Sequence, residues 1–302
     1  IGSLFFLIGV LASAGVGQNQ PPSAGDAVIR VETSLVSIPV SAADREGRFL
    51  SGVQQGQFRV FENGKEQPIA YFGGNDTPIV VALVLDMSDS TRFKLADIQG
   101  SAIRFIKQLQ PNDRALVMAF DKRVHLLSDV TGDRNALVNA VRKIQVGGGT
   151  SVYNAVDTVL RQYFAPIRGR KAVVLFTDGV DTTSASATYD STIRLATESD
   201  SMFYAIKFDT YTDVTEEARK RSLAEGQVST SIGGQPSGVV YERAGRYLSQ
   251  LPEVTGGRLY TAGSNDHLSN AFSQIIGELR SQYLLAFYPQ DQTKSGRRKI
   301  VV

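Results

Sequence analysis

Residues 79–85 read IVVALVL, a continuous apolar run with no charged or polar position. A half-exposed strand alternates apolar and polar residues, whereas an uninterrupted run of this kind is typical of a strand buried on both faces of a parallel sheet. The run leads directly into the polar segment Asp86-Met87-Ser88-Asp89-Ser90-Thr91. This stretch therefore predicts a central strand of a parallel sheet, with polar side chains where the strand ends.

Strands and helices alternate along the chain after this run. Further strands are expected at 115–120, 124–127, 172–176, 202–208, 257–261 and 283–288, and helices at 95–109, 135–144, 152–164, 188–197, 241–251 and 266–280. This order predicts a doubly wound α/β domain with a mostly parallel sheet flanked by helices. We assign it residues 78–302, with an insertion near 209–238.

The segment before this domain, residues 29–75, has a different pattern. Short alternating apolar runs are separated by turns, and the turn Glu62-Asn63-Gly64-Lys65 contains the Asn-Gly pair favoured in tight hairpins. We expect a small N-terminal all-β module, sandwich-like, with about four strands.

The first residues have the pattern of a secretory leader. Leu4–Leu11 is apolar and uncharged, Ala12-Ser13-Ala14 fits a cleavage site, and a stretch rich in Gln, Pro and Gly follows. We interpret residues 1–14 as a truncated signal peptide and 15–28 as a linker; the alternative is a buried core element. The apolar run is shorter than the roughly 20 residues that a membrane-spanning helix needs. We expect a secreted or periplasmic protein of the cell envelope, with no membrane span in the mature chain.

The composition limits the chemistry of any functional site. The 302 residues include no cysteine and only 2 histidines, which excludes thiol nucleophiles, iron–sulfur clusters and cysteine-based zinc sites. The 32 basic and 30 acidic residues nearly cancel, which argues against a general nucleic-acid binder. A functional site in this chain is therefore expected to be built from oxygen ligands.

Oxygen-bearing side chains gather at one predicted edge of the sheet. Asp86, Ser88 and Ser90 follow the first strand, Gly147-Gly148-Gly149-Thr150 precedes a helix, and Thr177-Asp178-Gly179 follows another buried strand. Ligand sites of such sheets lie beyond the carboxyl ends of the strands. Carboxylates and hydroxyls are the ligands that hard divalent cations prefer. The pattern predicts a site for Mg²⁺, with Mn²⁺ or Ca²⁺ as alternatives.

These three motifs together resemble the metal-ion-dependent adhesion site (MIDAS) of the von Willebrand factor type A (VWA) domain. The resemblance covers about residues 78–289 and implies a Rossmann-like VWA fold. It also implies that a partner's Glu or Asp completes the coordination of the cation, and that the ligands from this chain are Asp86, Ser88, Ser90, Thr150 and Asp178. The β module and the segment 278–289 resemble the VWFA-related proteins of Acidobacteria, which implies secretion from a bacterium.

The chain departs from the family pattern at three positions near these motifs. Asp89 stands where Gly is usual, Thr91 where Met is usual, and Asn154 where Asp is frequent. Asp89 would either add an outer charge to the cation site or strain a turn that prefers glycine. Asn154 would weaken a hydrogen bond that supports the ligands.

We expect a binding module rather than an enzyme, one that uses the cation to capture an acidic residue of a protein partner. Two alternatives stay open: a metal-dependent hydrolase with Asp89 as general base, and a structural envelope protein with a vestigial cation site. A phosphate loop is not favoured, because Gly147–Thr150 lacks the Gly-Lys-Ser/Thr ending. His125 and His267 are expected at surface or capping positions, far from any paired acid. The partner and the oligomeric state are not predicted.

Overall fold

A computed structural model describes residues 35–46, 48–74, 76–208, 231–232, 235–263, 265–289 and 298–302. All of them fall in one of the chain's two compact units, Ser34–Val302. The expected leader and linker and most of the 209–238 insertion lie outside the described residues. No helix among the described residues combines the length and apolar character needed to cross a membrane.

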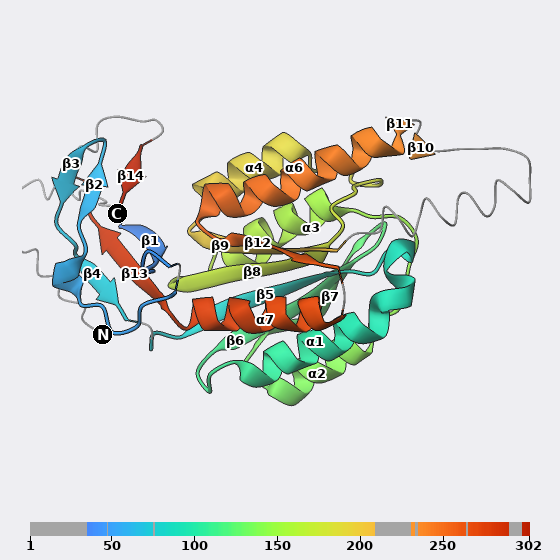
Figure 1. Ribbon diagram of the computed structural model, residues 1–302, viewed down its shortest axis with the longest axis horizontal. Helices are drawn as coiled ribbons and strands as arrows, with labels where there is room; N and C mark the ends of the chain where they lie inside the picture. Colours follow the sequence, from blue (N-terminus) through green and yellow to red (C-terminus); the bar gives the residue numbers. More distant parts are fainter. Residues whose placement is uncertain are drawn as a thin grey trace, which may run out of the picture. The chain divides into compact units, whose positions relative to one another are not determined.

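A six-stranded sheet forms the centre of the α/β domain, in the order β12-β9-β8-β5-β6-β7 (Figure 1). Its strands are β5 (Ile79–Asp86), β6 (Arg114–Phe120), β7 (Val124–Thr131), β8 (Arg170–Thr177), β9 (Ser201–Phe208) and β12 (Arg258–Ala262). All neighbours run parallel except the edge strand β7, which is antiparallel to β6. Every residue of β5 and β8 is buried, as the apolar run predicts. The predicted doubly wound, mostly parallel sheet is confirmed.

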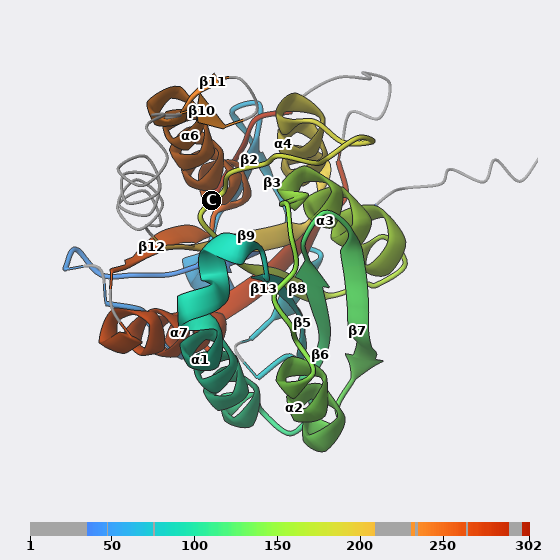
Figure 2. The same cartoon turned by 90° about the vertical axis from the view of Figure 1, so that its right-hand side faces the viewer.

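Helices cover both faces of this sheet, which is why its central strands are apolar throughout (Figures 1 and 2). One face carries α1 (Leu95–Gln108), α2 (Arg134–Arg142) and α7 (Asn265–Leu279), and the other carries α3 (Val152–Thr158), α4 (Tyr189–Glu198) and α6 (Ser237–Thr255). Successive residues of β5 contribute to the two cores alternately: Val81 and Leu83 pack toward α1, whereas Val80 and Ala82 pack toward α3.

Two helices differ from the predicted ranges near the site. The helix expected at 152–164 is divided, because α3 ends at Thr158 and a π-helical segment, η3 (Val159–Phe164), continues it. A 3₁₀-helix, η2 (Asp89–Lys94), precedes α1. The polar segment after β5 is therefore a short extended stretch followed by a tight turn.

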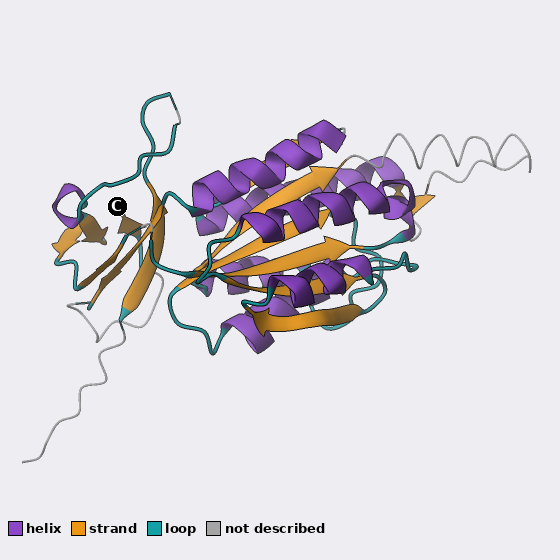
Figure 3. Cartoon of the chain, turned by 90° about the horizontal axis from the view of Figure 1, so that it is seen from below, coloured by secondary structure: helices purple, strands orange, loops and turns teal. Residues whose placement is uncertain are grey.

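The N-terminal module consists mainly of strands, as predicted, and it includes the end of the chain (Figure 3). One antiparallel sheet places β13 (Gln282–Phe287) between β1 (Val36–Ser41) and β4 (Tyr71–Gly73). A second places β2 (Val60–Glu62) between β3 (Lys65–Gln67) and β14 (Ile300–Val301). Short elements complete the described structure: η1 (Gln55–Gln57) and the hairpin β10 (Ser231–Ile232) and β11 (Gln235–Pro236).

The strand expected at 283–288 was assigned to the wrong sheet. It forms β13, which pairs with the N-terminal strands instead of completing the α/β sheet. All six residues of β13 are buried because it is the central strand of its own sheet. An apolar run indicates that a strand is buried on both faces. It does not indicate which strands lie beside it.

The Asn-Gly turn behaves as predicted. Asn63 and Gly64 connect β2 to β3 with φ angles of 49° and 82°. Two consecutive residues with positive φ are the requirement of the type I′ hairpin turn, which matches the twist of the flanking strands.

Candidate metal site

The predicted site lies where the order of strands reverses. Strand β5 has β6 on one side and β8 on the other, so the connections that leave the two central strands diverge. Such a switch point opens a crevice beyond the carboxyl ends of the strands. Asp86 is the last residue of β5 and Thr177 the last of β8, and these strands pair in register up to Leu85 and Phe176. The two acidic motifs are therefore neighbours across the switch point.

Four of the five predicted ligands belong to one series of hydrogen bonds, which the backbone between Thr177 and Asp178 closes into a ring. The Ser88 amide donates to Asp86 Oδ1 over 2.9 Å, and the Ser88 and Ser90 hydroxyl oxygens lie 3.0 Å apart. The Ser90 hydroxyl donates to Asp178 Oδ2 over 3.2 Å. Thr177 Oγ1 donates to Asp86 Oδ2 over 2.6 Å, and Thr177 directly precedes Asp178 in the chain, so their peptide bond completes the ring. The fold thus brings two carboxylates and two serine hydroxyls from separate loops into one polar group.

Thr150, the fifth predicted ligand, is held near this group through its backbone. Its amide donates to Thr182 Oγ1 over 2.9 Å, and its carbonyl accepts from the amides of Thr182 (2.9 Å) and Thr183 (3.0 Å). The preceding glycine loop is tied to the first motif, since the Gly147 amide donates to the Met87 carbonyl over 2.8 Å. Thr150 is 6 % exposed, and its hydroxyl forms no hydrogen bond with another described residue. A hydroxyl without such a bond is available as a ligand.

Asp86 is electrostatically unsatisfied. Burial of this side chain, in a residue that is 1 % exposed, disfavours its charged form, and the nearby Asp178 carboxylate adds to the effect. Together they raise the pKa of Asp86 to about 7, against opposing hydrogen bonds from Ser88 and Thr177. No described lysine, arginine or histidine forms an ion pair with Asp86. A divalent cation would supply the missing positive charge.

The donor set fits a hard divalent cation that is bound partly by hydroxyls. Within the described part of the chain, no group of three or more His, Cys, Asp or Glu side chains is placed to hold a metal ion. A cation at this edge would therefore depend on the serine and threonine oxygens as well as the two carboxylates. Oxygen ligands with few carboxylates suit Mg²⁺ or Mn²⁺.

Gly179 sets the conformation of the loop that carries Asp178. It has a φ of 81°, which L-residues with side chains rarely adopt. Its amide donates to Thr177 Oγ1 over 2.9 Å, and the next amide, that of Val180, donates to Asp178 Oδ1 over 3.0 Å. A Cβ atom here would lie 2.9 Å from the Leu248 side chain and 3.1 Å from the Ala244 carbonyl. The chain needs glycine here both for the turn and for the close approach of α6.

Of the two expectations for Asp89, the structure contradicts the one of a strained turn. Its side chain is exposed and accepts a 2.7 Å hydrogen bond from Arg92 Nη2 rather than bonding to a predicted ligand. It begins η2, and it is not among the residues with positive φ. The departure from glycine therefore causes no backbone strain of the expected kind.

The expectation that His125 lies far from an acid was wrong. His125 Nε2 lies 2.9 Å from Asp121 Oδ1. The β6–β7 hairpin pairs Ala119 with His125, which places the side chain of Asp121 within reach of the ring. Asp121 and His125 are four residues apart in the sequence, and this turn brings their side chains into contact.

Sequence reasoning assigned no role to Thr177, Asp181 or Thr182. Thr177 lies within the quoted Thr-Asp-Gly motif, so its position at the end of a buried strand was a usable signal. Asp181 and Thr182 lie in an irregular loop, and their bonds to the Thr150 segment depend on a loop conformation that no sequence pattern encodes.

Comparisons with known proteins agree with this geometry. Residues 81–180 match the family model of the von Willebrand factor type A domain, a range that includes all five predicted ligands. No curated protein matches the chain significantly.

Among solved structures, a von Willebrand factor type A protein from Catenulispora acidiphila is 13% identical with a TM-score of 0.52, covering 82% of this chain and 50% of that one. Proximal thread matrix protein 1 from the mussel byssus is 14% identical with a TM-score of 0.51, covering 72% of this chain and 51% of that one. A second structure of the mussel protein, with a zinc-occupied MIDAS motif, is 14% identical with a TM-score of 0.49, covering 71% and 48%.

The chain spans about half the length of these proteins, and at such identities the likeness concerns the fold alone. Three observations point to the same family: the match of residues 81–180, the order of the six strands, and the position of the acidic motifs at the strand ends. Residues 81–180 therefore match a von Willebrand factor type A domain, and the α/β domain around them has the fold of such domains.

Proposed function

We propose that this chain is a non-enzymatic binding module that holds Mg²⁺ or Mn²⁺ and uses it to capture an acidic residue of a protein partner. The ligands would be Asp86, Ser88, Ser90, Thr150 and Asp178. The observation that supports this most strongly is the ring of hydrogen bonds that joins four of these residues at the switch point of the sheet. VWA domains mediate protein interactions, which agrees with a binding role.

The side chains present explain why a partner would be needed. Five ligands leave a six-coordinate ion one position short. When bound, the cation supplies a positive charge that attracts a carboxylate oxygen. Asp86 and Asp178 would hold the ion, while the neutral hydroxyls of Ser88, Ser90 and Thr150 would complete the set without cancelling more of its charge.

The hydrolase alternative receives no support from the described residues. Its general base would be Asp89, whose carboxylate is engaged by Arg92 in an exposed pair. We also propose that the protein acts outside the cytoplasm, which is supported by the leader-like residues 1–14.

Mn²⁺ affinity should rise steeply with pH below about 7 and level off above it. The cation needs the charged form of Asp86, whose pKa is raised to about 7 when no cation is bound. Below that pKa one proton must leave for each ion bound, so the association constant should rise about tenfold per pH unit. Calorimetric titrations from about pH 5.5 to about pH 8.5, in buffers of different ionisation enthalpy, measure both affinity and proton release. Affinity that stays flat over this range, with no proton released, would contradict the proposed ligand set.

A further inference from the structure

The helix that follows Thr150 is not capped by its own first residues. Ser151 is the N-cap residue of α3, but its side chain makes no capping bond and donates instead to the Asp121 carbonyl over 2.8 Å. The first turn of a helix leaves amide groups that need other acceptors. In this protein the acceptors come from a different loop.

The β8–α4 loop supplies them. The Tyr153 amide donates to Asp181 Oδ2 over 3.1 Å, and the Asn154 amide donates to Ser184 Oγ over 3.1 Å. Asp181 also orders its own loop, accepting from the Ser184 amide (3.1 Å) and hydroxyl (2.6 Å). The loop that begins at Asp178 therefore caps the helix that begins after Thr150.

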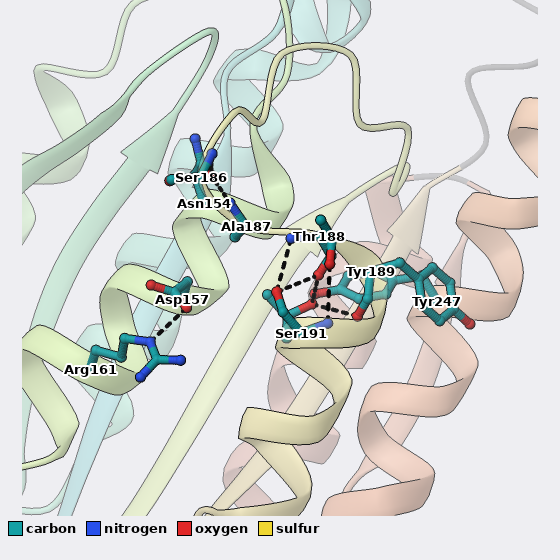
Figure 4. A network of polar contacts seen from close by, with 10 residues as sticks. Asn154, Asp157, Arg161, Ser186, Ala187, Thr188, Tyr189, Ser191 and Tyr247 are labelled. Atoms are coloured by element: carbon teal, nitrogen blue, oxygen red, sulfur yellow. Dashed lines mark hydrogen bonds and ion pairs between the residues drawn. The ribbon is translucent and has the colours of Figure 1, made fainter.

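The side chain of Asn154, on α3, also bonds to the residues just before α4. Its Oδ1 atom accepts from the Ser186 hydroxyl over 2.9 Å, the Ser186 amide over 3.3 Å and the Ala187 amide over 3.0 Å (Figure 4). Thr188, the next residue, is the N-cap of α4 and forms a capping box with Ser191. The side chain of Asn154 thus fixes the far end of the β8–α4 loop.

A third connection lies next to the site itself. Thr182 bonds to both the amide and the carbonyl of Thr150. Asp181, Thr182 and Asn154, which we call the loop clip, therefore connect the segment of Thr150 to the segment of Asp178 at three points.

We propose that Asn154 and Asp181 are positioning residues of the cation site, because they fix the Thr150 and Asp178 loops relative to each other before a cation binds. This inference rests on the proposed function. Ligands on two independently mobile loops would lose conformational freedom when a cation binds, and that cost would lower the affinity. Groups that orient metal ligands without touching the metal typically contribute 10- to 100-fold to affinity.

The loop clip accommodates the Asn at position 154. One carbonyl oxygen accepts all three bonds, so the amide serves as well as a carboxylate would. An Asp here would keep the acceptors and place a negative charge beside the N-terminus of α4, which favours that charge. The Asn154→Asp variant is therefore a conservative replacement.

Mn²⁺ affinity, measured by calorimetry, tests the clip with matched variants. Asn154→Ala should lower the affinity by about 10- to 100-fold, and Asn154→Asp should stay within about threefold of wild type. Asn135→Ala is the control, because Asn135 is an exposed residue in the first turn of α2 whose side chain makes no hydrogen bond with another described residue. It should also stay within about threefold of wild type. Asp181→Ala repeats the test from the other loop if Asn154→Ala does not fold.

The outcomes separate the two proposals. If the wild type binds Mn²⁺ and Asn154→Ala and Asp181→Ala bind it equally well, the positioning role is wrong while the cation site stands. If Asn154→Asp loses as much affinity as Asn154→Ala, the acceptor argument is wrong. If the wild type does not bind Mn²⁺, the proposed function fails and the positioning role with it. Faster amide exchange at Ala187 in cation-free Asn154→Ala would show separately that the clip orders this loop.

Discussion

Asp86→Asn should abolish Mn²⁺ binding and yet leave the cation-free protein more stable than the wild type at about pH 8. Loss of a carboxylate ligand removes the charge that holds the ion, so we expect the affinity to fall by more than about 100-fold. The same change removes a carboxylate that is buried, beside Asp178, and without a described cationic partner. Binding and stability should therefore move in opposite directions.

The sign of the stability effect follows from the pKa. Asp86 titrates near 7 in the folded, cation-free protein and near its ordinary value of 3.8 in the unfolded chain. The folded state then binds its proton more tightly, so the wild type loses stability as the pH rises from about 4 to about 7. The full shift corresponds to a loss on the order of 4 kcal/mol above that range. Asparagine does not titrate, so the variant lacks this loss.

Urea unfolding in a chelator at about pH 5 and about pH 8 measures this effect, and calorimetry measures the binding. Asp113→Asn is the matched control: Asp113 is also buried, but it precedes β6 at the opposite end of the strand and accepts bonds from the Ile79 and Gln110 amides. It should cost stability at both pH values without affecting Mn²⁺ affinity. An Asp86→Asn protein that binds Mn²⁺ like the wild type, or that is less stable at the higher pH, would show that Asp86 has another role.

Gly179→Ala should destabilise the protein by about 2–4 kcal/mol. The positive φ at this position costs about 1–2 kcal/mol for a residue with a Cβ atom. The added atom would also press against Leu248 and the Ala244 carbonyl, so α6 or the Asp178 loop must move. We expect Mn²⁺ affinity to fall as well, because Gly179 directly follows Asp178.

Gly64→Ala isolates the two contributions. Gly64 has a φ of 82°, almost the same as the 81° of Gly179, but nothing lies within 4 Å of its missing Cβ. Gly64→Ala should therefore lower the free energy of unfolding only by the conformational contribution, and it should leave Mn²⁺ binding unchanged. Chemical unfolding of both variants gives the comparison. Equal destabilisation would mean that the packing of α6 against this turn contributes nothing.

The central sheet could be predicted from the sequence because a strand that is buried on both faces is a continuous apolar run, which can be recognised without knowing its neighbours. The runs at 79–85 and 172–176 are apolar at every position, and β5 and β8 are buried throughout. The place of β13 could not be predicted in this way. Its burial is just as complete, but its neighbours β1 and β4 are more than two hundred residues away in the sequence.

The candidate site likewise has some features that could be predicted from the sequence and some that could not. Asp86, Ser88, Ser90 and Asp178 sit next to strand ends, so the topology of the sheet is sufficient to predict that they meet, and the ring of bonds confirms that it brings them together. The bonds of Asp181 and Asn154 depend on how an irregular loop folds back onto α3. The 121–125 turn, where His125 meets Asp121, is a smaller case of the same kind.

Titration of Mn²⁺ into the wild type and into Asp178→Ala tests the proposed cation site most directly. Asp178 accepts a hydrogen bond from the Ser90 hydroxyl and lies on the loop across the switch point from Asp86. Loss of its carboxylate should therefore break the ring of bonds between the ligands. We predict one ion per wild-type chain and an affinity more than about 100-fold weaker in the variant. Equal binding by the two proteins, or no binding by the wild type, would contradict a cation site built from these five residues.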